Sequence, residues 1–254
     1  MRVGLCTISN AEAAVETVLS QAARAGYDGV EIWGRDHVGD GSERTCRAIR
    51  RDADRLGLDV PVYGSYLRAG GDAFADAREH ELAVAERLAA DRIRVWAGTQ
   101  GYAERDSDHW EQVVADLRDL TALAADRGVE VTVERHAGTL TDEREGARRL
   151  VEAVDDSNLG LNYQPSFDAA PDAIVAEARE LAPLSNHVHL QAVSERGGES
   201  RCPLSEAFYD VSGVLAAFRA SDFEGYVNVE FVHDSAPYAE AIAADLDFLR
   251  SAVG

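Results

Sequence analysis

The sequence contains no lysine, and cysteine, methionine and proline are scarce. Of its 254 residues, 3 are cysteine, 1 is methionine and 6 are proline, and all 25 basic residues are arginine. Without lysine there is no Schiff-base chemistry, so any proton transfer must use carboxylates, histidine, tyrosine or cysteine. Cys6, Cys46 and Cys202 are too few and too scattered for a disulfide framework or a Cys-x-x-Cys metal site. We interpret them as free thiols.

Long hydrophobic runs are missing as well. The first residues, MRVGLCTISNAEAAVE, contain one arginine and only a short apolar run, which is not the pattern of a secretory signal. No stretch approaches the roughly 18 apolar residues of a membrane span. No polar linker divides the chain, and 46% of its residues are hydrophobic, enough for a sizeable core. We therefore expect one cytoplasmic domain over residues 1–254, without a membrane partner.

The charge is strongly of one sign. The 46 acidic residues exceed the 25 basic ones and give a formal net charge of −21. Such a field repels phosphodiester backbones, so we expect no nucleic acid partner and a small molecule as the substrate. The acid excess without lysine resembles the composition of proteins from salt-accumulating halophiles, in which surface carboxylates hold water and hydrated cations. The composition is compatible with a homo-oligomer.

Short apolar or β-branched segments alternate with longer segments that carry apolar residues at three- and four-residue spacing. The short segments predict eight strands: Arg2–Ile8, Gly29–Trp33, Asp59–Tyr66, Arg92–Ala97, Glu130–Glu134, Leu159–Tyr163, His187–Leu190 and Val227–Phe231. The longer ones predict eight helices: Ala11–Ala25, Glu43–Leu56, Asp72–Ala90, Ser107–Asp126, Thr141–Val154, Pro171–Leu181, Val211–Ala220 and Pro237–Ala252. Gly26, Gly57 and Gly128 are placed as residues that end helices. Thr141, and Ser9 or Asn10, are placed as helix N-caps.

This alternation favours a (β/α)₈ TIM barrel, a parallel eight-stranded barrel with outer helices. Strands recur about every 30 residues, the length of one βα unit, and the chain length is close to the roughly 250 residues of one such barrel. The rival is a doubly wound open sheet. It has a glycine-rich loop after its first strand, where this chain has Ile8-Ser9-Asn10.

Polar residues at the ends of three expected strands mark a candidate active site. In such a barrel, catalytic groups lie at the C-terminal ends of the strands. Glu134 ends the fifth strand, His189 lies near the end of the seventh, and Glu230 lies near the end of the eighth. A carboxylate in a valine-rich strand is costly to bury unless it is paired or bound to a metal. Two glutamates and a histidine therefore predict a site for Mn²⁺, Mg²⁺, Co²⁺ or Zn²⁺.

Five segments together resemble one known family. They are GYDGVEIW (26–33), VTVERH (131–136), LGLNYQPSF (159–167), HVHLQ (187–191) and GYVNVEF (225–231). In this order and spacing the chain is similar to the xylose isomerase-like TIM barrels. That family includes sugar-phosphate isomerases and epimerases, ketose 3-epimerases, hydroxypyruvate isomerase, inosose dehydratase and, more distantly, endonuclease IV.

The resemblance implies a metal site at Glu134, Gln164, His189 and Glu230. Gln164 stands where the family has an aspartate, so the formal charge of the ligands falls from three negative charges to two and the hold on a divalent metal weakens. The family's histidine three residues later is Phe167 here. A divalent ion remains the expected cofactor, held less tightly than in relatives that keep the aspartate.

The resemblance also implies a sugar or sugar-phosphate isomerase or epimerase. Glu134 and Glu230 would carry protons through an enediolate. A keto-inositol-type dehydratase on the same site stays open, as does a sugar-binding barrel that has lost catalysis, which Gln164 and Phe167 suggest. An endonuclease is disfavoured by the net charge and by the few His and Asp ligands. A glycoside hydrolase is disfavoured because its carboxylates usually end strands four and seven.

Further residues are predicted to contact the substrate. His136 lies two residues beyond Glu134 and on the same side, and the aromatic residues would form an apolar wall against sugar C–H groups. Simpler roles stay open for most of them: a structural salt bridge for Glu31, packing at the rim for the aromatic residues, and a surface ion pair for Arg196 or its loop neighbour Arg201. The full set of predicted substrate contacts is His136, Glu31, Trp33, Trp96, Tyr66 and Arg196. We expect His37, His80, His109 and His233 at the surface.

Overall fold

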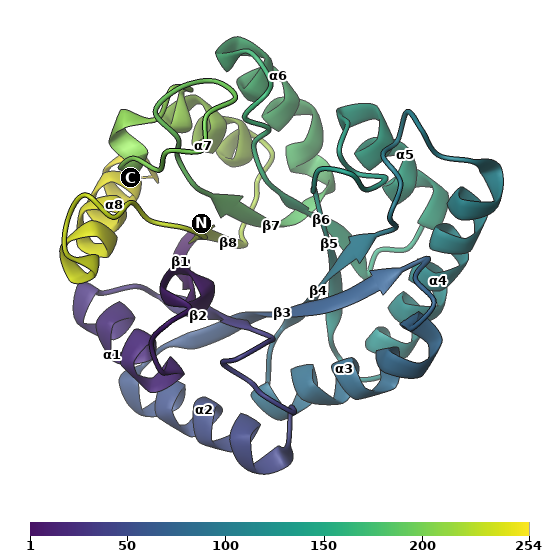
Figure 1. Ribbon diagram of the computed structural model, residues 1–254, viewed down its shortest axis with the longest axis horizontal. Helices are drawn as coiled ribbons and strands as arrows, with labels where there is room; N and C mark the ends of the chain where they lie inside the picture. Colours follow the sequence, from purple (N-terminus) through teal and green to yellow (C-terminus); the bar gives the residue numbers. More distant parts are fainter. Residues whose placement is uncertain (254) are drawn as a thin grey trace.

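The eight predicted strands form one closed parallel barrel. A computed structural model describes residues 1–253, and within them the strands are hydrogen-bonded in chain order, with β8 closing onto β1 (Figure 1). The strands are β1 (Arg2–Cys6), β2 (Gly29–Trp33), β3 (Asp59–Ala69), β4 (Arg92–Ala97), β5 (Glu130–Glu134), β6 (Leu159–Tyr163), β7 (Ser185–Leu190) and β8 (Tyr226–Val229). The prediction of a (β/α)₈ barrel is confirmed.

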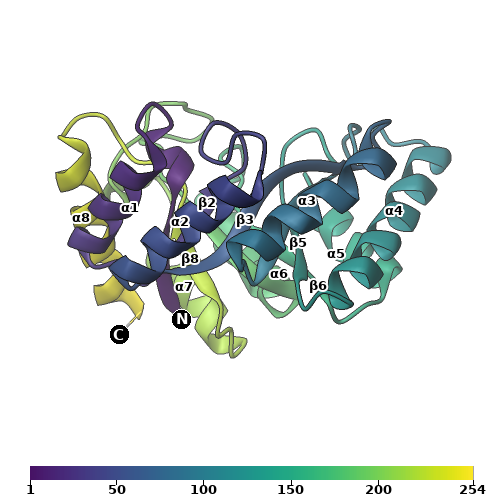
Figure 2. The same cartoon turned by 90° about the horizontal axis from the view of Figure 1, so that it is seen from below.

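A ring of helices surrounds the barrel, and both termini lie on its lower side in Figure 2. The helices are α1 (Val15–Ala25), α2 (Glu43–Leu56), α3 (Phe74–Leu88), α4 (Ser107–Ala125), α5 (Arg144–Val154), α6 (Pro171–Leu181), α7 (Val211–Ala220) and α8 (Tyr238–Val253). Strand residues such as Val131, Val133 and Leu161 are wholly buried in the same hydrophobic core as Leu117 and Leu120 of α4. Among the described residues, no helix combines the length and the apolar character that a membrane crossing requires.

The ends of several elements differ from the prediction. β1 stops at Cys6 and a 3₁₀ turn follows over Thr7–Asn10, so α1 begins only at Val15, with Ala14 as its N-cap. Ser9 is therefore not a cap. Its hydroxyl donates to the carbonyl of Cys6 at 2.6 Å, which shows that a serine side chain stabilises this turn instead.

The loop after β5 also corrects a predicted cap. α5 begins at Arg144, and the hydroxyl of Thr141 donates at 2.6 Å to the carbonyl of Glu134 instead of capping a helix. Thr141 thus ties the loop to the end of β5, where the predicted site lies. Gly26 and Gly57 are the C-caps of α1 and α2, as predicted. The C-cap of α4 is Asp126 and Gly128 lies two residues further on, and all three glycines have positive φ.

The barrel interior is polar near its C-terminal end. Three residues, His187 and His189 of β7 and Asn228 of β8, lie within 3.4 Å of a single carboxylate oxygen of Glu31 on β2. Their side chains are almost wholly buried, and these contacts cross the barrel. Most barrels of this type fill the same space with branched apolar residues. These buried polar contacts therefore both fill the barrel and position side chains of the candidate site.

Two helix ends provide a matched test of the backbone. Gly57 ends α2 at φ 71° with no atom within 4 Å of an added Cβ, whereas Ala89 ends α3 at φ 52°. Gly57→Ala should lower the free energy of unfolding by about 1 kcal/mol, because only glycine adopts this conformation without strain. Ala89→Gly should raise it by up to about 1 kcal/mol. Urea unfolding midpoints measure both, and changes of the same sign would contradict this account.

Candidate active site

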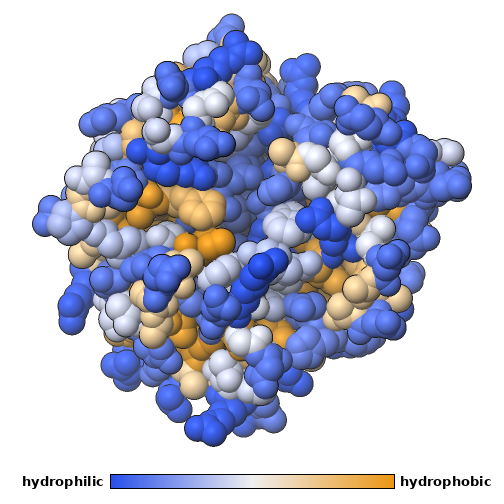
Figure 3. All heavy atoms as spheres, in the orientation of Figure 1, coloured by the Kyte–Doolittle hydropathy of each residue, from blue (hydrophilic) through white to orange (hydrophobic). Residues whose placement is uncertain are grey.

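A cavity of about 630 Å³ opens at the C-terminal ends of the strands. Its lining includes Glu134 at the end of β5, Gln164 after β6, His189 on β7 and Glu230 after β8. The face seen in Figure 3 is hollowed near its centre, and hydrophilic residues predominate around the hollow. The volume lies within the roughly 300–1,000 Å³ of small-molecule sites, so the predicted residues share one pocket of suitable size.

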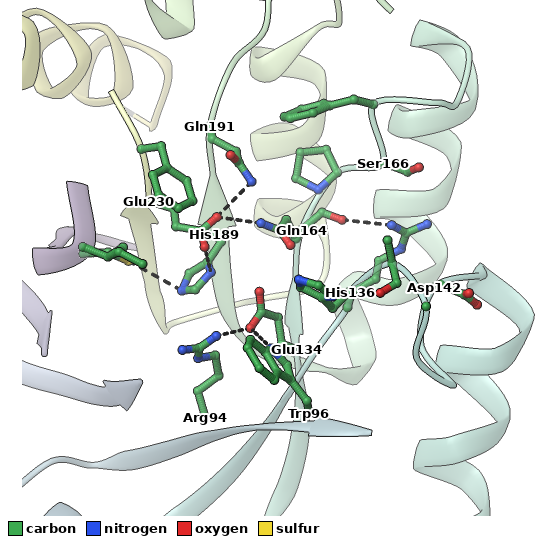
Figure 4. A pocket seen from close by; sticks show the side chains of 18 of the residues that line it. Arg94, Trp96, Glu134, His136, Asp142, Gln164, Ser166, His189, Gln191 and Glu230 are labelled. Carbon is green, nitrogen blue, oxygen red and sulfur yellow. Dashed lines mark hydrogen bonds and ion pairs between the residues drawn. The ribbon is translucent and has the colours of Figure 1, made fainter. Parts of the chain in front are cut away.

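Glu134, His189 and Glu230 point toward one another in this cavity (Figure 4). Each offers one ligand atom, and the three atoms all lie within 4.8 Å of one another. All three side chains are at least nine-tenths buried. The structure thus brings together the three residues that the sequence placed on three separate strands.

Glu134 is held by two nitrogen donors. The buried guanidinium of Arg94, on β4, forms an ion pair with its Oε2 atom, and the indole Nε1 of Trp96 donates to the same atom at 2.5 Å. The Nε atom of Arg94 also lies 3.7 Å from a carboxylate oxygen of Glu31. Arg94 therefore lies between two buried carboxylates, and it leaves the Oε1 atom of Glu134 without a hydrogen bond to the described residues.

Glu230 is held by neutral amides instead. Gln164 Nε2 and Gln191 Nε2 donate to its Oε2 atom at 2.6 and 2.9 Å. The Oε1 atom of Glu230 faces His189 Nδ1 at 3.6 Å and accepts no hydrogen bond from the described residues. Gln164, at the position of the family's aspartate, thus contacts a second predicted ligand through its amide nitrogen.

Glu31 lies behind His189. Its Oε2 atom is 2.6 Å from His189 Nε2, which directs the other ring nitrogen, Nδ1, toward Glu230. Asn162 Nδ2 approaches Nδ1 at 3.1 Å from β6, and the thiol of Cys6 lies 3.4 Å from Glu31 Oε2. Glu31 lines the cavity, as predicted for a substrate contact, but its hydrogen bonds orient His189.

The buried charges shift each other's pKa values. Burial alone would lower the pKa of His189, but Glu31 and Glu230 outweigh it and raise that pKa to about 9. Burial raises the pKa of Glu230 above its usual range, although His189 opposes this. Burial would also raise the pKa of Glu134, but Arg94 and His189 hold it below its usual range. The two glutamates therefore differ: Glu134 lies beside a permanent cation and Glu230 does not.

Three of the four predicted ligands fit a divalent metal ion. Glu134 and Glu230 each keep one oxygen free of hydrogen bonds to the described residues, and His189 has a carboxylate on its far nitrogen, as metal-binding histidines usually do. Two glutamates and one histidine are an ordinary donor set for Mn²⁺, Co²⁺ or Zn²⁺. A metal at Nδ1 would replace the proton that the high pKa of His189 favours. The three side chains therefore surround a positive charge in both states, either the metal ion or the proton on His189.

Most of the predicted substrate contacts line the cavity, namely His136, Glu31, Trp33, Tyr66 and Trp96. The aromatic rings form a connected wall: Trp33 Nε1 donates to the Tyr66 hydroxyl at 2.6 Å, and the Trp96 ring centroid lies 5.2 Å from those of both Tyr66 and His136. Arg196 lies outside this lining, and its Nε donates to the carbonyl of Asp168 at 2.7 Å. Substrate contact by these residues stays a prediction.

One charged residue of the site was missed in the sequence. Arg94 lies two residues before Trp96 in the strand RIRVWA, and its alternation with apolar residues was the available signal for an inward charge.

His37 and His233 were expected at the surface but are buried; His37 Nδ1 lies 2.8 Å from the hydroxyl of Thr7. Cys6 and Cys46 are buried free thiols, and Cys202 is a partly exposed one.

Two arginines of β4 test the buried ion pair. Arg94→Met should lower the free energy of unfolding by about 3–5 kcal/mol, because it leaves Glu31 and Glu134 buried without their cation. Arg92→Met removes a more exposed pair with Glu130 and should cost less than about 1 kcal/mol. Urea unfolding at neutral pH measures the difference. Equal losses would show that Arg94 does not compensate buried charge.

Comparison with known proteins places the chain in a family. Residues 19–252 match the family model described as the xylose isomerase-like TIM barrel. A 3-dehydroshikimate dehydratase from Bacillus anthracis is 25% identical over 205 residues, which cover 76% of this chain and 72% of that protein. A 3-dehydroshikimate dehydratase from Pseudomonas aeruginosa is 28% identical over 259 residues, which cover 92% of this chain but only 38% of that longer protein.

Solved structures share the fold. The crystal structure of the IOLI protein with a bound zinc atom superposes with a TM-score of 0.81 over 100% of this chain and 98% of that one. At 16% identity this likeness concerns the fold alone. Because the family model matches nearly the whole chain, and the closed barrel and its three converging strand-end residues agree with the resemblance seen in the sequence, the protein belongs to the xylose isomerase-like TIM barrel family.

Proposed function

We propose that this barrel removes a proton next to the ketone of a polyhydroxylated small molecule. One observation carries the proposal. Two buried glutamates from β5 and β8 face one cavity, and each has one oxygen held by nitrogen donors and the other free of hydrogen bonds to the described residues. Such a pair can take a proton at one carbon and deliver a proton elsewhere on the same substrate.

The two glutamates suit different parts of this reaction. Glu134 lies beside Arg94, which favours its ionised form and hence its use as a base. Glu230 lies between two neutral amides, where burial favours the protonated form and hence its use as an acid. His189, hydrogen-bonded to Glu31, provides positive charge near an enediolate oxygen. When bound by these residues, a divalent ion supplies Lewis acidity at the ketone oxygen.

The fate of the second proton decides the reaction class. If the proton returns to the opposite face of the same carbon, the product is an epimer; if it moves to the neighbouring carbon, an aldose and a ketose interconvert. Isomerisation or epimerisation of a sugar or sugar phosphate is the first candidate, and the family to which the chain belongs supports it.

Dehydration is the second candidate, and the two named relatives favour it. In this case Glu134 removes the proton from the carbon next to the ketone. Glu230 protonates the hydroxyl on the following carbon, and this hydroxyl leaves as water. One C–H and one C–O bond break and a carbon–carbon double bond forms, so no oxidant is needed. With 3-dehydroshikimate, loss of water gives an aromatic dihydroxybenzoate, which absorbs in the ultraviolet.

A single experiment separates these candidates. The protein, supplied with Mn²⁺ or Co²⁺, is incubated in D₂O with a ketose such as D-fructose and, separately, with 3-dehydroshikimate. Deuterium incorporation at the carbon next to the ketone, measured by NMR, indicates isomerisation or epimerisation. A rise in aromatic absorbance indicates dehydration. Binding without either signal would identify a sugar-binding barrel that has lost catalysis and would contradict the proposed function.

Replacing each glutamate tests the proton carriers. Glu134→Gln and Glu230→Gln should each lower kcat by about 10²–10⁴-fold, because an amide neither accepts nor donates the transferred proton. Glu130→Gln, at the opposite end of β5, changes the same charge and should leave kcat within about twofold. Circular dichroism checks that all three variants fold. Activity that survives both site substitutions excludes the acid–base role.

Restoring the family's aspartate tests the metal site. Gln164→Asp should tighten the binding of Co²⁺ about 10-fold or more, because it returns a third negative ligand to the site. Gln191→Asp adds the same charge on the other side of Glu230, where the family has no ligand, and should have a smaller effect. Isothermal titration calorimetry with CoCl₂ measures both. Equal tightening would mean that net charge, rather than the position of the ligand, governs the affinity.

A further inference from the structure

We propose that Arg201 binds a carboxylate of the substrate, so that the substrate is a polyhydroxylated keto acid rather than a neutral sugar. Building on the proposed function, this inference names the class of molecule that the same cavity takes. Three observations on the Arg201 guanidinium carry it. The group has no carboxylate partner among the described residues, neighbouring side chains hold it in place, and it lies at the cavity wall near Glu230.

Arg201 differs from the other arginines that line the cavity. Arg94 is paired with Glu134 and Glu31, and Arg135 is paired with Glu177 at 3.0 Å. Arg201 has no carboxylate within ion-pair distance among residues 1–253. In a chain with 46 acidic residues, a partly buried guanidinium without a carboxylate partner is unexpected for a purely structural arginine.

The side chain of Arg201 is held in place without a counter-ion. A β-bridge joins Val193 and Arg201 across the loop after β7. The guanidinium lies 4.8 Å from the ring centroid of Phe231 and 5.9 Å from that of Phe167. Its Nη1 atom donates to the side-chain oxygen of Gln191. These contacts fix the group before a ligand arrives, which reduces the entropy lost on binding.

The remaining donors of Arg201 suit a planar anion. Nη1 is used by Gln191, while Nε and Nη2 donate to no acceptor among the described residues. These two form one edge of the guanidinium, with parallel N–H groups that match the two oxygens of a carboxylate. Burial lowers the pKa of Arg201, and a bound anion would compensate that cost. Phosphate oxygens share this chemistry and are therefore included in the test.

The position of Arg201 connects this contact to the reaction. Gln191 accepts from Arg201 and donates to Glu230 at 2.9 Å, so one amide separates the guanidinium from the glutamate that would move the proton. Asp142, Glu143 and Asp168 also line the cavity and repel an anion from the rest of its rim. A carboxylate would therefore settle at Arg201 and place the neighbouring carbons beside Glu230.

The test compares binding of charged and neutral molecules. Isothermal titration calorimetry would measure Kd for 3-dehydroshikimate, for D-fructose and for inorganic phosphate. Arg201→Gln should weaken binding of 3-dehydroshikimate about 10- to 100-fold, as expected for loss of a hydrogen-bonded charge, and change that of D-fructose less than about twofold. Arg201→Lys should recover part of the loss. Arg219→Gln, an exposed arginine on α7, is the control for net charge and should change neither Kd.

The outcomes separate this inference from the proposed function. Binding of 3-dehydroshikimate that depends on Arg201, with no turnover of this compound or of D-fructose, supports the carboxylate site and contradicts the proposed function. Turnover of D-fructose without any binding of 3-dehydroshikimate overturns the carboxylate site and leaves the proposed function standing. Equal losses in Arg201→Gln and Arg219→Gln, or tighter binding of phosphate than of 3-dehydroshikimate, also overturn it.

Discussion

The buried contact between Arg94 and the carboxylates of Glu31 and Glu134 is the interaction on which the site depends. Glu31 orients His189, and Glu134 is one of the two proposed proton carriers, so both need their charge inside the barrel. A carboxylate in this environment loses its hydration and would take up a proton without a nearby cation. The guanidinium keeps the charge in place, and with it the polar interior that distinguishes this barrel from one packed with apolar residues.

The two glutamates of the site are unequal for the same reason. Glu134 has a guanidinium as its partner, whereas Glu230 has two neutral amides, Gln164 and Gln191. One side of the cavity therefore favours an ionised carboxylate and the other a protonated one. In the family resemblance Gln164 occupies the place of a metal-binding aspartate. Here its amide nitrogen contacts Glu230, so the residue that replaces the aspartate touches one of the two proposed proton carriers.

The sequence was a good guide to the barrel and to the main site residues. Hydrophobic periodicity locates strands and helices because each element must bury one face or stripe, and polar residues at the ends of valine-rich strands stand out. Element ends were less predictable. Thr141 was expected to cap a helix, but its hydroxyl contacts the carbonyl of Glu134, and Ser9 stabilises a 3₁₀ turn. A short polar side chain can satisfy several backbone groups, and the chain's path decides which one is near.

What the sequence determined by itself is the fold, the absence of lysine chemistry and the convergence of Glu134, His189 and Glu230, because strand order in a parallel barrel brings strand ends together. Only the tertiary structure decided the pairings. It placed Glu31 behind His189, Arg94 between two carboxylates and Arg201 at the cavity wall without a counter-ion among residues 1–253. Pairing depends on distances of a few ångströms across the barrel, and residue types and spacing along the chain do not specify them.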